Sequence, residues 1–150
     1  MSPKGSTTQV MNGQIARNPL SGETITFRRT SAETRGEAIE LELALRPLGA
    51  PAGLPHRHLP TERFELTQGM LCVWIAGRLP QLMRAGDVVE VPSRSWHFIV
   101  ALRSTRARVS VRPGMRFDEL LVRWAALGRG DLGLTTLLRL VPLLREHGCI

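Results

Sequence analysis

The sequence predicts an all-β domain followed by two C-terminal helices, and three observations carry this prediction. The chain has 150 residues, close to the common size of a single domain. Between residues 23 and 112, short apolar runs alternate with turn residues, which is typical of a β-sandwich or a small barrel. After Pro113 and Gly114 the apolar residues recur every three or four positions, as they do in helices.

Eight strands follow from this pattern. Ala38–Arg46 is the clearest, because Leu41, Leu43 and Leu45 alternate with other residues and therefore face one side. Residues 47–55 hold three Pro and two Gly, which predicts a loop. The expected strands are Glu23–Thr30, Ala38–Arg46, Glu62–Thr67, Met70–Ala76, Gln81–Met83, Asp87–Val91, Trp96–Leu102 and Arg106–Val111.

The strands divide the chain into three parts. Residues 1–20 are polar and predict a flexible N-terminal arm, residues 21–113 form the barrel, and residues 114–150 form a helical extension. The second helix is expected over residues 134–147, with Pro142 as a kink or a start. The first helix follows from Phe117, Leu120, Leu121, Trp124 and Leu127, with Gly128 as its end.

Composition argues against several partners and locations. The net charge is +7, but the basic residues are spread along the chain, so we expect no nucleic-acid partner. The longest apolar stretch, residues 132–144, contains Arg139 and Pro142 and is too short to cross a membrane. Two lone cysteines, Cys72 and Cys149, and the lack of an apolar signal region predict a cytoplasmic protein. Open strand edges and two apolar helices predict a homodimer.

Three of the four histidines give the strongest chemical signal. His56 and His58 are separated by one residue, so both point to the same side of an extended chain. Glu62 has the same parity, and His97 lies in the apolar strand at residues 96–102. Three imidazoles and one carboxylate suit one divalent transition metal, such as Zn, Mn, Fe, Ni or Cu.

These residues resemble the two sequence motifs of the cupins. The first motif reads G-x5-H-x-H-x3,4-E-x6-G, and the second reads G-x5-P-x-G-x2-H-x3-N. The resemblance implies a jelly-roll barrel of two antiparallel sheets that encloses a metal ion, with His56, His58, Glu62 and His97 as its ligands. The positions that agree with the motifs are His56, His58, Glu62, Gly69, Gly86, Pro92 and His97.

The chain departs from the two motifs at three positions. Gly49 stands one place earlier than the first motif requires. Arg94 replaces the last glycine of the second motif, so we expect it either to adopt a positive φ or to change the turn and reach over the barrel mouth. Ala101 replaces the final asparagine and removes a hydrogen bond. None of these changes removes a ligand.

The site predicts a small-molecule substrate. An open metal site can bind water or a substrate oxygen, and an apolar lining favours a mostly apolar substrate. No other Glu, Asp, Lys or Tyr is obviously aimed at the interior, so the expected catalytic proton carrier is Glu62, shifting off the metal, or else a metal-bound hydroxide. The expected pocket residues are Phe64, Ser95, Ile99, Leu41 and Leu43.

Proteins with the cupin motifs catalyse several reactions, so the resemblance does not choose among them; we favour a metal-dependent enzyme, with a polyketide-type cyclase or dehydratase and a dioxygenase ranked above an isomerase. The alternative is a non-catalytic metal- or ligand-binding module, such as a sensor or an accessory protein. Sensor cupins often lack a ligand, whereas this chain keeps all four, which favours the enzyme. Outside the motifs, we expect His147 to be a favourable charge at a helix end and Cys149 to be an inert or exposed thiol.

Overall fold

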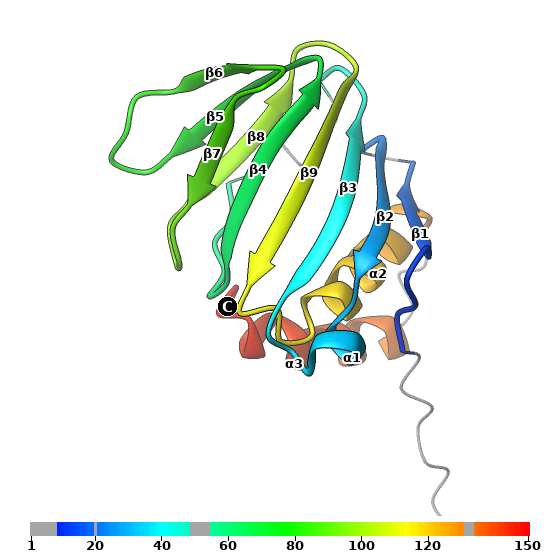
Figure 1. The fold of residues 1–150 in the computed structure, drawn as a ribbon. Coiled ribbons are helices and arrows are strands. Elements are labelled where there is room, and N and C mark those ends of the chain that lie inside the picture. Colours follow the sequence, from blue (N-terminus) through cyan, green and yellow to red (C-terminus); the bar gives the residue numbers. More distant parts are fainter. Residues whose placement is uncertain (1–8, 20, 49–54, 131–133) are drawn as a thin grey trace, which may run out of the picture.

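The fold consists of two antiparallel sheets with helices at one end (Figure 1). The computed structural model describes residues 9–19, 21–48, 55–130 and 134–150. The large sheet has the order β1-β2-β3-β9-β4-β7, and the small sheet has the order β6-β5-β8. The strands are β1 (Ile15–Asn18), β2 (Glu23–Arg29), β3 (Ile39–Leu45), β4 (Thr61–Gln68), β5 (Met70–Ile75), β6 (Gln81–Arg84), β7 (Val88–Val91), β8 (His97–Ala101) and β9 (Thr105–Arg112).

All eight expected strands are present, and each end agrees within one residue. Alternation explains this agreement: in β3, Leu41, Leu43 and Leu45 are buried and their neighbours are more exposed. Gly69 makes the tight turn between β4 and β5 at a φ of 92°, where a Cβ atom would collide with the carbonyl oxygen of Ser104. The prediction of an antiparallel barrel with two C-terminal helices is confirmed.

The expected flexible arm is wrong for part of its length. Residues Ile15–Asn18 form β1, which pairs with β2 at the edge of the large sheet. Val10, Ala16 and Asn18 are buried. The polar composition of this segment does not predict a strand. The strand forms because β2 supplies partners for its backbone hydrogen bonds. Residues 1–8 of the arm lie outside the described residues.

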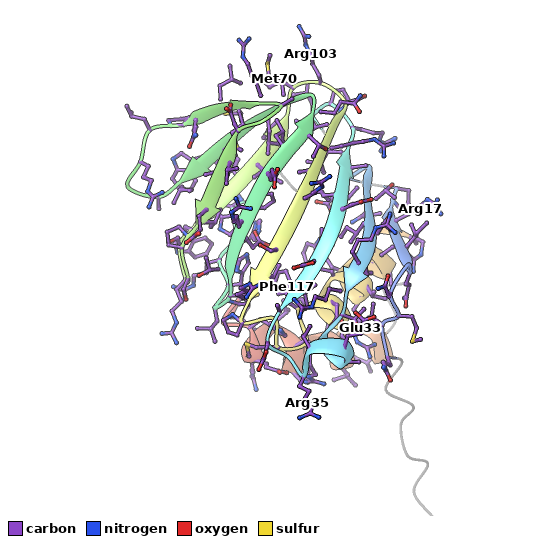
Figure 2. The ribbon with its side chains drawn as sticks, viewed as in Figure 1. Arg17, Glu33, Arg35, Met70, Arg103 and Phe117 are labelled. Atoms are coloured by element: carbon purple, nitrogen blue, oxygen red, sulfur yellow. The ribbon has the colours of Figure 1, made fainter. Side chains whose placement is uncertain are left out.

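Three helices lie at one end of the large sheet, opposite the end marked by Met70 and Arg103 (Figures 1 and 2). They are α1 (Ser31–Thr34), α2 (Phe117–Gly128) and α3 (Leu134–Glu146). The long helices match the prediction, with Pro142 inside α3, whereas the single turn of α1 was not expected. None of the helices in the described part of the chain has the length and apolar character that a membrane crossing needs.

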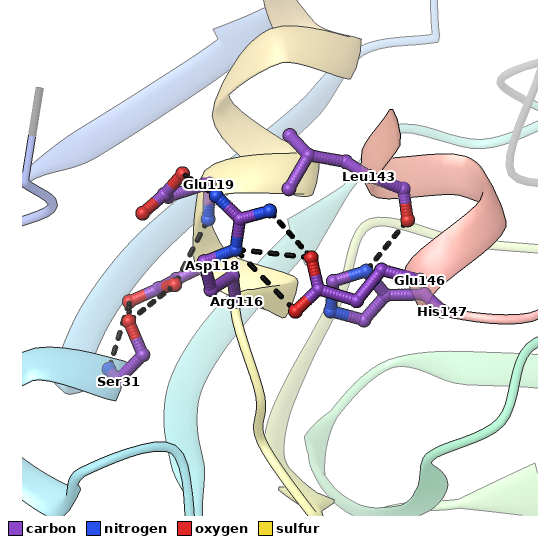
Figure 3. Close-up of polar contacts among 7 residues, drawn as sticks. All are labelled: Ser31, Arg116, Asp118, Glu119, Leu143, Glu146 and His147. Carbon is purple, nitrogen blue, oxygen red and sulfur yellow. Dashed lines mark hydrogen bonds and ion pairs between the residues drawn. The ribbon is translucent and has the colours of Figure 1, made fainter. Parts of the chain in front are cut away.

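Polar contacts join these helices to one another (Figure 3). The buried carboxylate of Asp118 accepts hydrogen bonds from the backbone N–H and the hydroxyl of Ser31, each at 2.9 Å. Arg116 pairs with Glu146, which joins the start of α2 to the end of α3. The C-terminal segment reaches the barrel, since the backbone N–H of Leu59 donates to the carbonyl of His147. Leu134, Leu138 and Val141 are exposed on α3, and the homodimer stays a prediction.

Candidate metal centre and cavity

Three histidine rings lie close together, two of them buried in the barrel and one exposed. His97 begins β8, and His56 pairs with it through two backbone hydrogen bonds of 3.0 and 2.9 Å. The ring centroids of His56, His58 and His97 lie 4.3 to 5.8 Å apart. One nitrogen from each ring lies within 4.8 Å of the other two, so the three could hold a metal ion. His58 and His97 are buried, whereas His56 is exposed.

Backbone contacts orient the two buried rings. The Nδ1 atom of His58 lies 2.8 Å from the carbonyl oxygen of Pro60, and that of His97 lies 2.8 Å from the carbonyl oxygen of Ser95. A carbonyl oxygen only accepts, so each Nδ1 carries the proton and each Nε2 of the neutral ring presents a lone pair. Both Nε2 atoms are buried and lack a hydrogen-bond partner in the described structure.

Glu62 brings a carboxylate to the two buried rings. It stands near the start of β4, is 8% exposed, and places Oε2 at 3.4 Å from His58 Nε2 and 3.5 Å from His97 Nε2. Burial alone would raise the pKa of Glu62, but the positive charge that the two imidazoles carry when protonated outweighs it and lowers that pKa. Burial alone would lower the pKa of His58, but the nearby carboxylate of Glu62 outweighs burial and raises that pKa. Two nitrogen lone pairs and a carboxylate facing one another fit a shared cation.

Arg94 adopts the positive φ expected of it, at 60°. Its backbone N–H donates to the carbonyl of His58 at 2.7 Å, so this turn holds the loop that carries a buried ring. Ala101, which replaces the asparagine of the motif, is buried and pairs with Leu71 in the small sheet. Gly49 lies outside the described residues.

The histidines open into a cavity of about 390 Å³. Four of the five expected pocket residues line it: Leu41, Leu43, Phe64 and Ile99. Ser95 does not, and its role here is to accept the hydrogen bond from His97. The helices and the C-terminus supply a wall that the strand pattern could not predict. That wall consists of Phe117, Leu120, Leu121, Trp124, Leu144, Cys149 and Ile150.

Glu23 also lines the cavity, so the expectation of no further acidic residue at the interior is wrong. It is the first residue of β2, and burial raises the pKa of its carboxyl. The signal was present in the sequence: Glu23 has the parity of Ile25 and Phe27, whose buried side chains face the core.

His147 differs from its expected role. His147 is fully buried, its Nδ1 donates to the carbonyl of Leu143 at 2.7 Å (Figure 3), and burial lowers its pKa. It is therefore a neutral packing residue and not a surface charge. Phe117 lies between its ring and that of His58, with centroid distances of 5.5 and 5.1 Å. The thiol of Cys149 borders the cavity, and burial raises its pKa.

No protein-family model and no curated protein matches this sequence. Solved structures do match the fold. KdgF from Halomonas sp. is similar at a TM-score of 0.58 and 17% identity over 73% of this chain and 96% of that chain. An RmlC-like cupin from Shewanella frigidimarina NCIMB 400 is similar at 0.55 and 16%, over 72% and 92%. Ectoine synthase from P. lautus is similar at 0.56 and 9%, over 70% and 73%. The two sheets, the convergent histidines and these likenesses together show that the chain has the cupin fold.

Proposed function

We propose that this protein is a metal-dependent enzyme that acts on a small, mostly apolar, oxygen-bearing molecule. The observation that carries the proposal is the pair of buried, unpartnered Nε2 atoms that face the carboxylate of Glu62. An acceptor cluster of this kind is unfavourable inside a protein unless protons or a cation occupy it.

The residues that would hold the metal are His56, His58, His97 and Glu62. The donor set suits Zn, Mn, Fe, Ni or Cu, and such an ion supplies Lewis acidity at a substrate oxygen or, if redox-active, dioxygen chemistry. The carbonyls of Pro60 and Ser95 keep the two buried rings in the tautomer that leaves Nε2 free. Glu62 is the proposed proton carrier of the site.

The cavity supports the substrate class. Its walls are aliphatic and aromatic apart from the histidines, two glutamates and a thiol. Walls of this kind exclude water and bind an apolar body, while the histidine cluster supplies the polar end. The favoured reactions remain a polyketide-type cyclisation or dehydration and a dioxygenation. The free cysteines, Cys72 and Cys149, accord with the proposed cytoplasmic location.

The alternative function is a non-catalytic metal- or ligand-binding module. The exposure of His56 favours it, because a ligand at the rim is held less rigidly than the buried pair. The two functions share the cavity and differ in whether a substrate is turned over there; a chain that binds no metal would fit only the ligand-binding module.

Metal analysis of protein purified without added metal or chelator tests the proposal. We expect about one transition-metal ion per chain in the wild type. The double variant His56→Ala, His97→Ala should lose the ion, and Arg57→Ala should keep it, because Arg57 is exposed beside Trp96. Zn would support cyclisation or dehydration, and a redox-active ion would support dioxygenation. A wild type that binds none of the five metals after reconstitution contradicts the enzyme and leaves the binding module.

A further inference from the structure

The cavity carries a second carboxylate that the metal cluster does not use. Glu23 opens β2, and Glu62 lies near the start of β4. Strands β3 and β9 separate β2 from β4 in the large sheet, yet both glutamates line the same cavity. The large sheet therefore presents one carboxylate among the histidines, on β4, and another on β2, with two strands between them.

An apolar surface lies between the two carboxylates. The residues of β3 and β9 that line the cavity are Leu41, Leu43 and Val109, and all three are buried. Ile25 extends this surface beside Glu23 on β2. A ligand that spans the cavity would place its middle part against hydrocarbon and its ends against polar groups.

The surroundings of Glu23 leave its charge without a cation from the protein. None of the described residues that line the cavity is Lys or Arg. Burial and the charge of Glu62 raise the pKa of the Glu23 carboxyl, and nearby Ser21, whose hydroxyl oxygen accepts a hydrogen bond from the backbone N–H of Glu23, opposes this rise. A carboxyl group in such a place gains from a ligand that brings a hydrogen-bond donor.

We propose that Glu23 is the second polar contact of the ligand, and that its carboxyl accepts a hydrogen bond from an N–H or O–H group. This inference rests on the proposed function, because it takes the histidine cluster as the site of the other end. It narrows the substrate class to an apolar molecule with an oxygen function at one end and an amine or a hydroxyl at the other. Glu23 then selects substrates by contact with the end that lies away from the metal ligands.

Three aromatic probes of similar size test the contact in metal-free protein: toluene, benzyl alcohol and benzylamine. Trp124 lines the cavity, whereas Trp74 and Trp96 do not, so its fluorescence reports binding. In Glu23→Gln we expect benzylamine to bind about tenfold more weakly and toluene to bind unchanged. Benzyl alcohol should lose less, because an amide oxygen still accepts a hydrogen bond. The relative losses show whether the site prefers an amine or a hydroxyl.

Two further glutamate variants locate the contact. Glu90→Gln removes the same charge from an exposed position on β7 and should change nothing. Glu62→Gln removes the carboxylate at the histidine end of the cavity, so it tests whether benzylamine binds there instead. The inference is overturned if benzylamine binds Glu23→Gln as tightly as the wild type, or if only Glu62→Gln weakens it.

Unchanged toluene binding shows that Glu23→Gln keeps its cavity. If that variant does not fold, Glu23→Asp replaces it; the shorter carboxylate should bind benzylamine more weakly than the wild type, and equal binding overturns the inference. The probes are read without metal, so this result is independent of the metal analysis. Loss of the metal site would contradict the proposed function alone.

Discussion

Arg94 shows at the residue scale how this chain positions a candidate ligand. Its φ of 60° lies in the left-handed region, which a side chain with a Cβ atom adopts at a cost of about 1–2 kcal/mol. The same residue donates its backbone N–H to the carbonyl of His58. Ser93, one residue earlier, donates its hydroxyl to the carbonyl of Leu59. The turn after β7 therefore holds the loop of His58 through the Arg94 backbone and the Ser93 hydroxyl. The side chain of Arg94 takes no part in these two contacts.

We predict that Arg94→Gly stabilises the protein. Glycine removes the strain at this φ, and its greater freedom in the unfolded chain offsets part of the gain, so the net increase is about 0.5 kcal/mol. Urea denaturation measures it, and metal content should not change. Arg103→Gly is the control, because Arg103 lies in a bend without a positive φ and should gain nothing. A loss of stability in Arg94→Gly would mean that the side chain contributes more than the strain removes.

The candidate ligands could be predicted from the sequence because their spacing is a local property. The interval from His56 to His58 sets a common direction, and Glu62 follows at matching parity. Glu23 could have been found by the same rule, since it alternates with Ile25 in one strand. The burial of His147 could not, because it depends on how a distant helix end packs against Phe117.

At the scale of elements, eight strands could be predicted from the sequence, whereas β1 and α1 could not. The alternation within β3 or β9 records which face is buried, so it fixes strand limits closely. The sequence of β1 carries little alternation, and α1 has a single turn that depends on its capping box at Thr30 and Glu33. Periodicity predicted α2 as a helix, but its position as a cavity wall comes from tertiary contacts.

Asp118 holds the start of α2, and we predict that Asp118→Asn lowers the free energy of unfolding by about 2 kcal/mol. The amide keeps one neutral oxygen acceptor and replaces the other charged oxygen with an NH2 donor, so the backbone N–H and the hydroxyl of Ser31 can no longer donate to separate carboxylate oxygens. Urea denaturation measures the loss, and Ser31→Ala completes a double-mutant cycle that should show coupling. The same change at exposed Asp87, which accepts from the backbone N–H of Arg84, should cost less. Equal losses at both sites would show that the buried contact with Ser31 contributes no more stability than the exposed contact of Asp87.

At the scale of the whole molecule, the barrel and the helical extension share one cavity. The sheets supply the histidines and the carboxylates, while α2, α3 and the C-terminal residues supply an apolar wall. Two contacts join this wall to the loop of His58: the backbone hydrogen bond from Leu59 to His147, and the packing of Phe117 between two imidazoles. The stability of the helical extension and the shape of the cavity are therefore linked.

His147 makes this link sensitive to pH. Its pKa is lowered chiefly by burial; the carbonyl of Leu143 and the carboxylate of Glu146 oppose the shift, and the charges of Arg116 and His58 add to it. The unfolded chain takes up a proton near pH 6.5, whereas the folded protein takes it up at a lower pH. The contribution of His147 is therefore complete above about pH 6.5 and declines as the pH falls, by up to about 1.4 kcal/mol per pH unit.

We predict that His147→Asn removes this acid sensitivity. Asparagine keeps an N–H donor for the carbonyl of Leu143 but does not titrate, and its smaller side chain leaves the variant less stable at pH 8. Urea denaturation of metal-free protein between pH 8 and pH 5 measures both curves. The gap between wild type and variant should narrow as the pH falls, because only the wild type loses the contribution of a neutral buried ring. His58, whose raised pKa acts in the opposite direction, is present in both proteins and largely cancels in the difference. A gap that stays constant across this range would mean that His147 does not set the acid limit of the fold.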